Sequence, residues 1–312
     1  MVRAERNHKD KPSIMAPEGD LTIKLEEPEI KIPWFKVLMT HARNHPLGAF
    51  GACIVIAMVF MATFAEGITA FDPELNAFEV MLTAPGYPYY LGTDQFGRDV
   101  FTRIIYGART ALFVGLTAAF VGSVLGLIIG VASAYFGGRF DLILQRVMDV
   151  FMAFPLIIMA LAIVATLGPG IENVIIAIII PFVPQCARVV RSNALAIREI
   201  PYVDAARALG FSDARIILRH MVPNVMAPFL IMASTFVGHA ILLEASLSYL
   251  GMGVNEPTPA WGLMLQGGAE EYAESAPWLA IWPGVAISLA VFGFNLFGDA
   301  LRDILDPKLR SI

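Results

Sequence analysis

Two groups of charged residues stand out in a sequence that is otherwise poor in charge. The first comprises Asp94, Arg98, Asp99 and Arg103, which lie within one short segment. Acids and arginines at this spacing predict a local charge network that shapes a gate region. The surrounding Gly-x-Asp-x-x-Gly-Arg-Asp pattern superficially matches a calcium loop, but it lacks the distal Glu of that motif. No metal site is therefore predicted.

The second group lies in segment 188–220, whose core reads Glu199-Ile-Pro-Tyr-Val-Asp-Ala-Ala-Arg-Ala-Leu-Gly210. Pro201 suits the first turn of a helix, where its missing N–H would be unpaired anyway. Gly210 fits a helix stop, where a left-handed residue is needed. Ser212 and Asp213 predict the cap of a second short helix that runs towards Pro223. The segment is therefore expected to fold as a helix, a glycine turn and another helix.

Small side chains at Ala205 and Ala206 predict a smooth helix face that fits a groove of another protein, with Arg207, Arg215 and Arg219 pairing with its acidic rim. Such a docked helix transmits force, as coupling to a motor subunit requires. Two alternatives stay open: a solvated amphipathic hairpin without a partner, and a DNA-reading helix-turn-helix, which the net charge of −5 disfavours. The candidate coupling residues are Glu199, Tyr202, Asp204, Ala205, Ala206, Arg207, Gly210 and Arg215.

Catalytic motifs are absent from the sequence. It contains no Gly-x4-Gly-Lys-Ser/Thr phosphate loop, no His-Glu-x-x-His and no Gly-x-Ser-x-Gly. The chain is therefore not expected to be an enzyme or to hold a cofactor. His239 lies in an apolar run. An ionisable residue inside a membrane is costly, so its presence suggests a functional role. His239 is a candidate for lining a pathway, with a hydrogen bond to a neighbouring helix as the alternative.

These residues are positioned by a chain that is 57% hydrophobic and only 16% charged. A soluble domain has about 25% charged residues, so the composition predicts lipid as the solvent. A spanning helix needs about 20 apolar residues. Six runs approach this length, at 47–65, 110–136, 150–166, 173–187, 222–243 and 277–298. The fourth is short and contains Pro181 and Pro184, while Gly168-Pro169-Gly170 separates it from the third. A single broken segment over 155–187 is the alternative.

Lys and Arg in the connecting segments predict the orientation. With both termini in the cytoplasm, the inside segments 1–46, 137–147, 188–220 and 299–312 hold 19 Lys and Arg, and the outside segments hold 3. The expected organisation is then a polar tail at 1–33, an interfacial helix at 34–46, a membrane domain at 47–298 and a tail at 299–312. The outer loops are expected at 67–109 and 244–276.

Several segments resemble one family. Asp204-Ala-Ala-x-x-x-Gly210 with Pro223 resembles the "EAA" loop of permease subunits of ATP-binding-cassette importers. Asp204 replaces the usual Glu, and His220 replaces the usual Ile. His-x-x-Pro-Asn at 220–224 is similar to the peptide-type branch. Five further segments resemble the same branch: Leu91-Gly-Thr-Asp-Gln-Phe-Gly-Arg-Asp-Val100, Glu244-Ala-Ser-Leu-Ser-Tyr-Leu-Gly-Met-Gly253, Pro257-Thr-Pro-Ala-Trp-Gly262, Phe294-Asn-Leu-Phe-Gly-Asp-Ala-Leu-Arg-Asp303 and Asp306-Pro-Lys-Leu-Arg310.

The resemblance covers about 34–312 and points to the C-type partner of the permease pair in dipeptide and oligopeptide importers of the bacterial inner membrane. It implies an all-α type I permease fold of about six spans, with the EAA loop docked on an ATPase. It also implies a second homologous permease, two ATP-binding subunits that hold ATP and Mg, and an extracytoplasmic solute-binding protein. No nucleic-acid partner is expected. An ion-coupled transporter or channel is the main rival, and a membrane scaffold is the other.

Overall fold

Helices account for all the regular structure in the part of the chain that the computed structural model describes, which is residue 43 and residues 45–305. The predicted tail at 1–33 lies outside these residues, as does the predicted interfacial helix at 34–46 except for residues 43, 45 and 46. The elements in chain order are α2 (Pro46–Thr63), α3 (Ala65–Ile68), the 3-10 turn η1 (Phe78–Val80), α4 (Val100–Phe136), α5 (Gly138–Met152), α6 (Leu156–Leu167), α7 (Ile171–Arg198), α8 (Pro201–Ala208), α9 (Asp213–Ile216), the π-helical turn η2 (Ile217–Met221), α10 (Val222–Tyr249), α11 (Trp261–Glu270) and α12 (Trp278–Leu305).

Five spans are long and apolar enough to cross a membrane: α2, α4, α7, α12 and the continuous stretch Asp213–Tyr249 that ends in α10. A sixth span results if α5 and α6, which meet at 88°, are counted as one broken crossing. The prediction of an all-α membrane protein with about six spans is confirmed. The helices continue beyond the predicted apolar runs. α4 begins ten residues before 110, α10 ends at Tyr249 rather than 243, and α12 reaches Leu305 inside the predicted tail 299–312.

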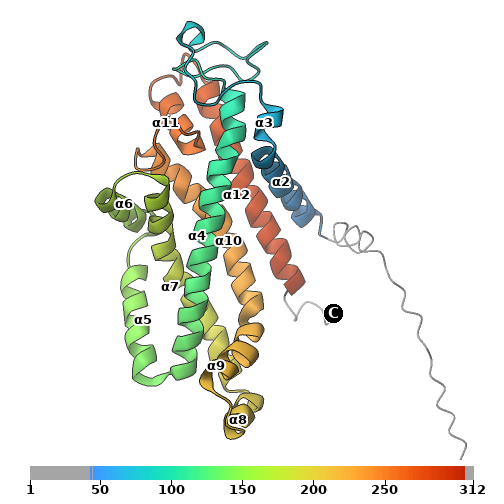
Figure 1. Cartoon of the computed structure of the whole chain (residues 1–312), viewed down its shortest axis with the longest axis vertical. Helices are drawn as coiled ribbons and strands as arrows, with labels where there is room; N and C mark the ends of the chain where they lie inside the picture. The colour runs from blue at the N-terminus through green and yellow to red at the C-terminus, as the bar shows by residue number, and fades with distance from the viewer. Residues whose placement is uncertain (1–42, 44, 306–312) are drawn as a thin grey trace, which may run out of the picture. The chain divides into compact units, whose positions relative to one another are not determined.

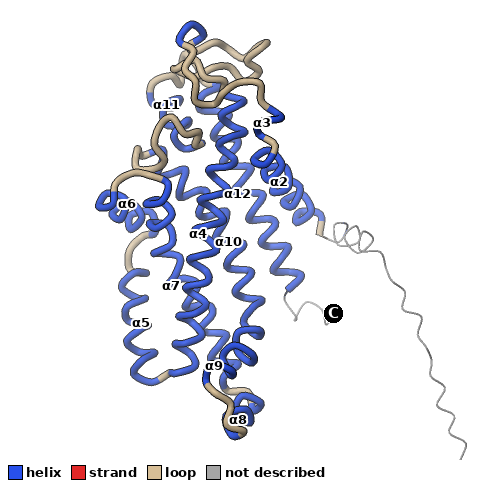
Figure 2. Tube along the Cα trace, in the orientation of Figure 1, coloured by secondary structure: helices blue, strands red, loops and turns tan. Residues whose placement is uncertain are grey.

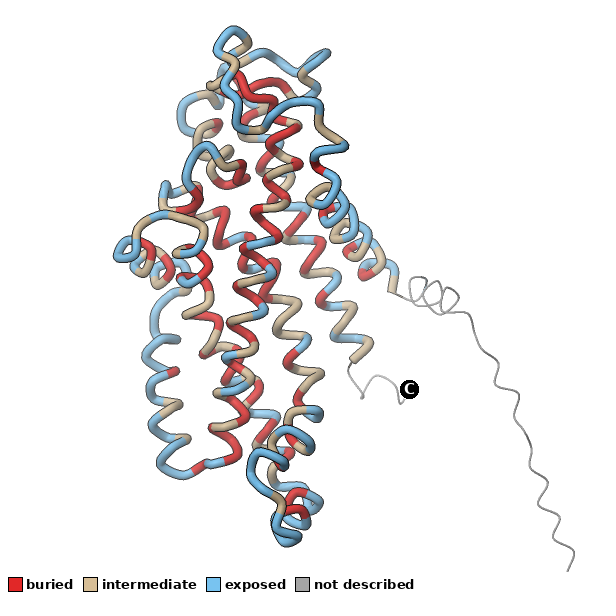
Figure 3. The backbone as a smooth tube through the Cα atoms, in the orientation of Figure 1, coloured by how far each residue is buried: buried red, intermediate tan, exposed pale blue. Residues whose placement is uncertain are grey.

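The third predicted span, 150–166, is not one helix. α5 ends at Met152, and α6 begins at Leu156, after Pro155. Proline disfavours the α conformation of the residue before it, so the chain turns at Phe154. α5 buries Met148 alone and presents most of its length outward (Figure 3).

The fourth predicted span, 173–187, is too short. α7 passes through Pro181 and Pro184 without ending and runs for 28 residues to Arg198. Proline is tolerated in membrane helices because neighbouring helices satisfy the freed backbone groups. The first eleven residues of the predicted loop 188–220 are therefore helix. The alternative of one broken segment over 155–187 is wrong, because Gly168 and Gly170 adopt φ of +91° and +140° and separate α6 from α7.

The core forms where α4 meets α7 and α10. Glycines of α4 lie at these contacts. A Cβ on Gly115 would lie 2.9 Å from Ile241 of α10, and one on Gly126 would lie 2.5 Å from the Cβ of Cys186 of α7. Small residues at these positions let the helix backbones approach closely. Figure 3 shows buried residues following the length of α4, whereas α2 is mostly exposed.

The two candidate sites lie at opposite ends of this bundle, and α4 runs from one to the other (Figure 1). One end carries α8 and α9 and is called the α8 end below. The other carries α11 and residues 69–99 and is called the α11 end. Figure 2 shows that most of the non-helical chain gathers at the α11 end. The fold therefore separates the two charged groups by the length of its longest helix.

Candidate functional sites at the two ends of the bundle

At the α8 end, the predicted helix and glycine turn are present, but the second helix is not a separate short one, because it begins at Asp213 and continues through η2 into α10. Pro201 opens α8, and Gly210 closes it with φ of +75°. The N–H of Gly210 donates to Arg207 O at 2.9 Å, and the N–H of Phe211 donates to Ala206 O at 3.1 Å. This arrangement satisfies the last carbonyls of the helix and needs a residue that tolerates positive φ. Ser212 holds the cap position of α9, but its side chain makes no capping hydrogen bond.

α8 has one buried face and one exposed face. Val203 and Ala206 pack into the bundle, while Tyr202, Ala205 and Leu209 are exposed. The prediction that Ala205 and Ala206 share one smooth outer face is wrong, because consecutive residues of a helix point about 100° apart. The outer face instead combines an alanine with larger apolar groups, and Leu209 is 74% exposed.

Hydrogen bonds and ring contacts fix α8 against the start of α10. The Tyr202 hydroxyl donates to His220 O at 3.2 Å, and Asn224 Nδ2 donates to the same oxygen at 2.6 Å. The rings of Phe211 and His220 stack with centroids 6.2 Å apart. The residues between α8 and α10 therefore form a braced unit rather than a loose loop.

Four of the charged residues predicted at this end, namely Glu199, Asp204, Arg207 and Arg215, have partners within the chain, and Arg219 is exposed. Arg207 lies 3.3 Å from Asp204, and Arg215 lies over the Phe211 ring at 4.1 Å. Glu199 is exposed beside Arg198, with 3.6 Å between the charged atoms. All of these contacts are at least partly exposed, so each contributes about 0–1 kcal/mol to stability. Their charges remain accessible to a partner.

A contact that was not predicted from the sequence joins this end to α4. The Tyr135 hydroxyl donates to Asp213 Oδ1 at 2.5 Å, and the Arg207 guanidinium lies 5.1 Å from the Tyr135 ring centroid. Tyr135 is buried in the last turn of α4. Local spacing gives no signal for this pair, because its members are 78 positions apart.

At the α11 end, the predicted charge network is present, but Glu256 takes the place of Asp99. Arg98 Nε lies 2.7 Å from Asp94 Oδ2, and Arg98 Nη1 lies 2.6 Å from Glu256 Oε2. Arg103 stands 3.7 Å from the same Asp94 oxygen and 3.6 Å from the same Glu256 oxygen. Two arginines thus share two carboxylates across residues far apart in sequence. Glu256 was missed because only the fold brings it to Arg98.

Burial makes this network more than a surface ion pair. Asp94, Arg98 and Arg103 are each at most 5% exposed, whereas the Glu256 side chain is 41% exposed. Burial alone would lower the pKa of Arg98, but the hydrogen bonds and charges of Glu256 and Asp94 outweigh it and hold that pKa above its usual value. Arg103 Nη1 also donates to Pro73 O at 2.7 Å and to Pro257 O at 3.1 Å. The network therefore fastens residues 73 and 256–257 to the start of α4.

Asp99 does not belong to this network, contrary to the prediction. Its Oδ2 accepts from the Thr102 N–H at 2.9 Å and from the Thr102 hydroxyl at 2.7 Å. It is the N-cap of α4, a role that favours a short side chain with an acceptor oxygen. The prediction placed the start of this helix ten residues too late and so missed the cap.

Two polar residues of α10 lie in different surroundings. Glu244, which was predicted to begin an outer loop, is inside α10, 1% exposed, and accepts from the Ser248 hydroxyl at 2.7 Å. His239 is exposed.

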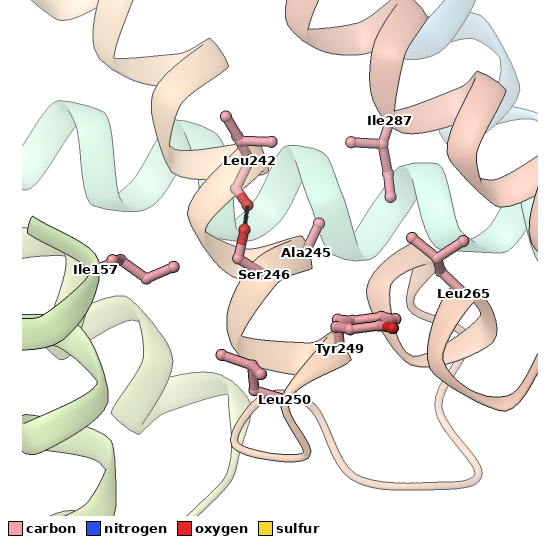
Figure 4. A pocket seen from close by; sticks show the side chains of 8 residues that line it. All are labelled: Ile157, Leu242, Ala245, Ser246, Tyr249, Leu250, Leu265 and Ile287. Atoms are coloured by element: carbon pink, nitrogen blue, oxygen red, sulfur yellow. Dashed lines mark hydrogen bonds between the residues drawn. The ribbon is translucent and has the colours of Figure 1, made fainter. Parts of the chain in front are cut away.

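Beyond His239 on the same helix, an open cavity of about 380 Å³ is lined by Ile157, Leu242, Ala245, Ser246, Tyr249, Leu250, Leu265 and Ile287 (Figure 4). Figure 4 shows Ile157 of α6 on one side of α10, with Leu265 of α11 and Ile287 of α12 on the other.

Comparisons with known proteins agree with this arrangement. Residues 122–311 match the family model of the binding-protein-dependent transport system inner membrane component. The chain is 39% identical over 298 residues to the dipeptide transport system permease protein DppC of Alkalihalophilus pseudofirmus, covering 96% of this chain and 97% of that one. It is 38% identical over 285 residues to the glutathione transport system permease protein GsiD of Escherichia coli, covering 91% and 93%.

A solved structure supports the fold. The inward-facing MetNI methionine ABC transporter aligns with a TM-score of 0.54 at 19% identity, over 66% of this chain and 97% of the matched chain. The family match covers more than half of the sequence, and the two relatives cover nearly all of it. The chain belongs to the family of inner membrane components of binding-protein-dependent transport systems, the permease subunits of ABC importers.

Proposed function

We propose that this chain is the permease subunit of an ATP-driven importer of peptides or similar small solutes. The observation that carries the proposal is the braced, glycine-closed α8 at one end of a bundle of membrane spans, in a chain whose relatives are named as dipeptide and glutathione permeases. Cargo specificity is expected to reside largely in an extracytoplasmic solute-binding protein. ATP hydrolysis, with its Mg, belongs to a separate subunit.

Docking of an ATPase subunit at the α8 end is supported by the exposed face of α8. Tyr202, Ala205 and Leu209 recur at helical spacing and are exposed, although the Tyr202 hydroxyl turns back to His220. An amphipathic helix that lays such a face into a groove is a common recognition mode. Exposed Asp204 and Arg207 flank this face and are placed to pair with a rim of opposite charges. This docking puts the α8 end in the cytoplasm, as the excess of Lys and Arg also predicts.

A second homologous permease is proposed to complete the translocation path. His239, Leu242, Ser246 and Tyr249 follow one another along α10 at spacings of three and four residues, and all are at least partly accessible in the isolated chain. A histidine on an accessible face of a spanning helix is costly against lipid and favours a water-filled path or a protein partner. This face is therefore the proposed half-path, with His239 as one of its polar members.

The α11 end is then the outer end, where the loaded binding protein delivers its cargo. Acidic side chains gather there without Lys or Arg on α11 and its flanking loops: Glu256, Glu270, Glu271 and Glu274. The network of Asp94, Arg98, Arg103 and Glu256 is proposed to hold this end in shape during delivery, as part of a gate. The complete assembly would contain two permeases, two ATP-binding subunits and one binding protein.

A photo-cross-linking amino acid in place of Leu209 tests this assignment in native membranes. We expect it to capture an ATPase subunit that carries a phosphate loop. The same probe in place of Leu75, which is 70% exposed at the α11 end, should capture a solute-binding protein instead. Capture of an ATPase from position 75, or of none from position 209 when the affinity-purified complex contains one, would contradict the assignment.

A further inference from the structure

The contacts that join α8 and α9 to the rest of the bundle are unevenly distributed. Among the described residues, the polar contacts between residues 199–216 and α4 converge on one side chain, Tyr135. Its hydroxyl donates to Asp213 at 2.5 Å, and its ring faces the guanidinium of Arg207 at 5.1 Å. Tyr135 thus touches the first turn of α9 with its hydroxyl and the last turn of α8 with its ring.

Tyr135 is held firmly enough to transmit a displacement. It is 7% exposed and lies one residue before the end of α4. Its ring packs edge-on against Phe136 with centroids 5.2 Å apart. A hydrogen bond between a phenol and a carboxylate is charge-assisted, and its strength falls steeply with misalignment. Movement of Asp213 therefore acts on a side chain that cannot swing away independently of its helix.

α4 leads directly from this contact to the other candidate site. Its 37 residues rise about 1.5 Å each, so it is on the order of 55 Å long. Its first turn carries Asp99 as the cap and Arg103 as a member of the buried charge network. Close packing of Gly115 and Gly126 against α10 and α7 supports the helix along its length. A displacement of the last turn of α4 is therefore transmitted to the α11 end through one continuous helix.

We propose that Tyr135 is a positioning residue that transfers movement of α8 and α9 to α4, through its hydrogen bond to Asp213. The inference rests on the proposed function, because it supposes that an ATPase moves α8. It adds the residue pair through which that movement enters the membrane domain. Arg207 then has a role within the chain, orienting the Tyr135 ring, as well as facing a partner.

The test uses the complete transporter in proteoliposomes and compares Tyr135→Phe with the wild type. This variant keeps the ring and its contact with Arg207 and removes only the hydroxyl. A hydrogen bond to a charged group contributes about 1.5–3 kcal/mol, so we expect substrate transported per ATP hydrolysed to fall about tenfold while ATP hydrolysis continues. Tyr106→Phe is the matched control on the same helix, since its hydroxyl has no hydrogen bond to a described residue. It should leave the ratio unchanged.

A double-mutant cycle separates positioning from simple stability. If the hydroxyl acts through Asp213, Tyr135→Phe should have no further effect on the ratio once Asp213→Ala is present. A purely structural role would lower uptake and ATP hydrolysis together and leave their ratio intact. An unchanged ratio in Tyr135→Phe, or additive effects in the cycle, would overturn the proposal.

A second measurement does not depend on knowing the cargo. Amide hydrogen exchange of the purified complex, with and without ATP, should show a nucleotide response at residues 93–104 in the wild type. Tyr135→Phe should abolish that response, and its persistence would overturn the proposal. Failure of the proposed function has a different signature, namely a wild-type complex that contains no ATPase or moves no solute on ATP.

Discussion

At the scale of single residues, charged side chains with similar sequence surroundings play different parts. Asp94 accepts hydrogen bonds from two backbone N–H groups and from Arg98 and lies 3.7 Å from Arg103, whereas Asp99, five residues later, caps a helix. The burial of each charged side chain decides how much its interactions contribute to stability. Breaking a buried ion pair leaves a charge without compensation, which costs several kcal/mol, while an exposed pair contributes little.

Replacing Arg98 by Ala should therefore destabilise the α11 end severely. The carboxylate of Asp94 would stay buried and lose its shortest ionic contact, at a cost of about 3–5 kcal/mol. We expect the melting temperature of the purified protein to fall by more than about 5 °C. Glu256→Gln is the comparison, because that side chain is 41% exposed and glutamine keeps an acceptor oxygen for Arg98, so it should lower the melting temperature less than Arg98→Ala does. Equal melting temperatures for the two variants would contradict the network described here.

At the scale of elements, α8 depends on the backbone conformation of one residue. Gly210 has φ of +75°, and no atom lies within 4 Å of a Cβ built on it. A substitution there meets no steric obstacle, so its cost arises from the backbone alone. A β-branched residue in the left-handed region costs about 1–2 kcal/mol or more, whereas Asn adopts it readily.

Gly210→Val should consequently uncouple transport without unfolding the bundle. We expect uptake to fall about tenfold at normal expression, because the turn that sets α8 would be lost in most molecules. Gly210→Asn, measured beside it, should retain uptake within about twofold. Normal uptake by the valine variant in a stably expressed transporter would show that the turn is not needed for coupling.

The helices, the glycine turn and the packing of α4 were predictable from sequence because each depends on local pattern. Pro201 followed nine positions later by Gly210 signals a short closed helix, and the glycines of α4 recur at helical spacing. The extent of α7 was not predictable, because neighbouring helices override the effect of Pro181 and Pro184. Glu256 and Tyr135 were missed for another reason. Their partners are 158 and 78 positions away, so only the assembled fold identifies them.

At the scale of the whole molecule, the conformational change can be driven by ATP or by an ion gradient. An ion-coupled transporter needs ionisable groups inside its spans. Among the described spans, Glu244 is the most deeply buried acid. Its hydrogen bond from Ser248, and the bond that the Val254 N–H donates to the same Ser248 hydroxyl at 3.2 Å, give it a structural role in holding the α10–α11 connection.

Glu244→Gln distinguishes these two roles. Glutamine keeps an acceptor oxygen for Ser248 and removes the titratable proton. For an importer driven by ATP, we expect uptake within about twofold of the wild type, since the neutral hydrogen bond is retained. When the external pH is varied, uptake by the wild type and by Glu244→Gln should change by the same factor. Complete loss of uptake in a well-folded Glu244→Gln protein would instead favour a proton-coupled mechanism.

The energy requirement of uptake by the reconstituted complex tests most directly whether ATP drives transport. Proteoliposomes would contain this chain, its partner permease and the ATP-binding subunits, with the binding protein and a labelled dipeptide outside. An ATP-driven importer should accumulate the dipeptide only when ATP is trapped on the side of α8, and this accumulation should persist after ionophores collapse all ion gradients. Accumulation driven by a proton or sodium gradient without ATP would contradict ATP-driven transport.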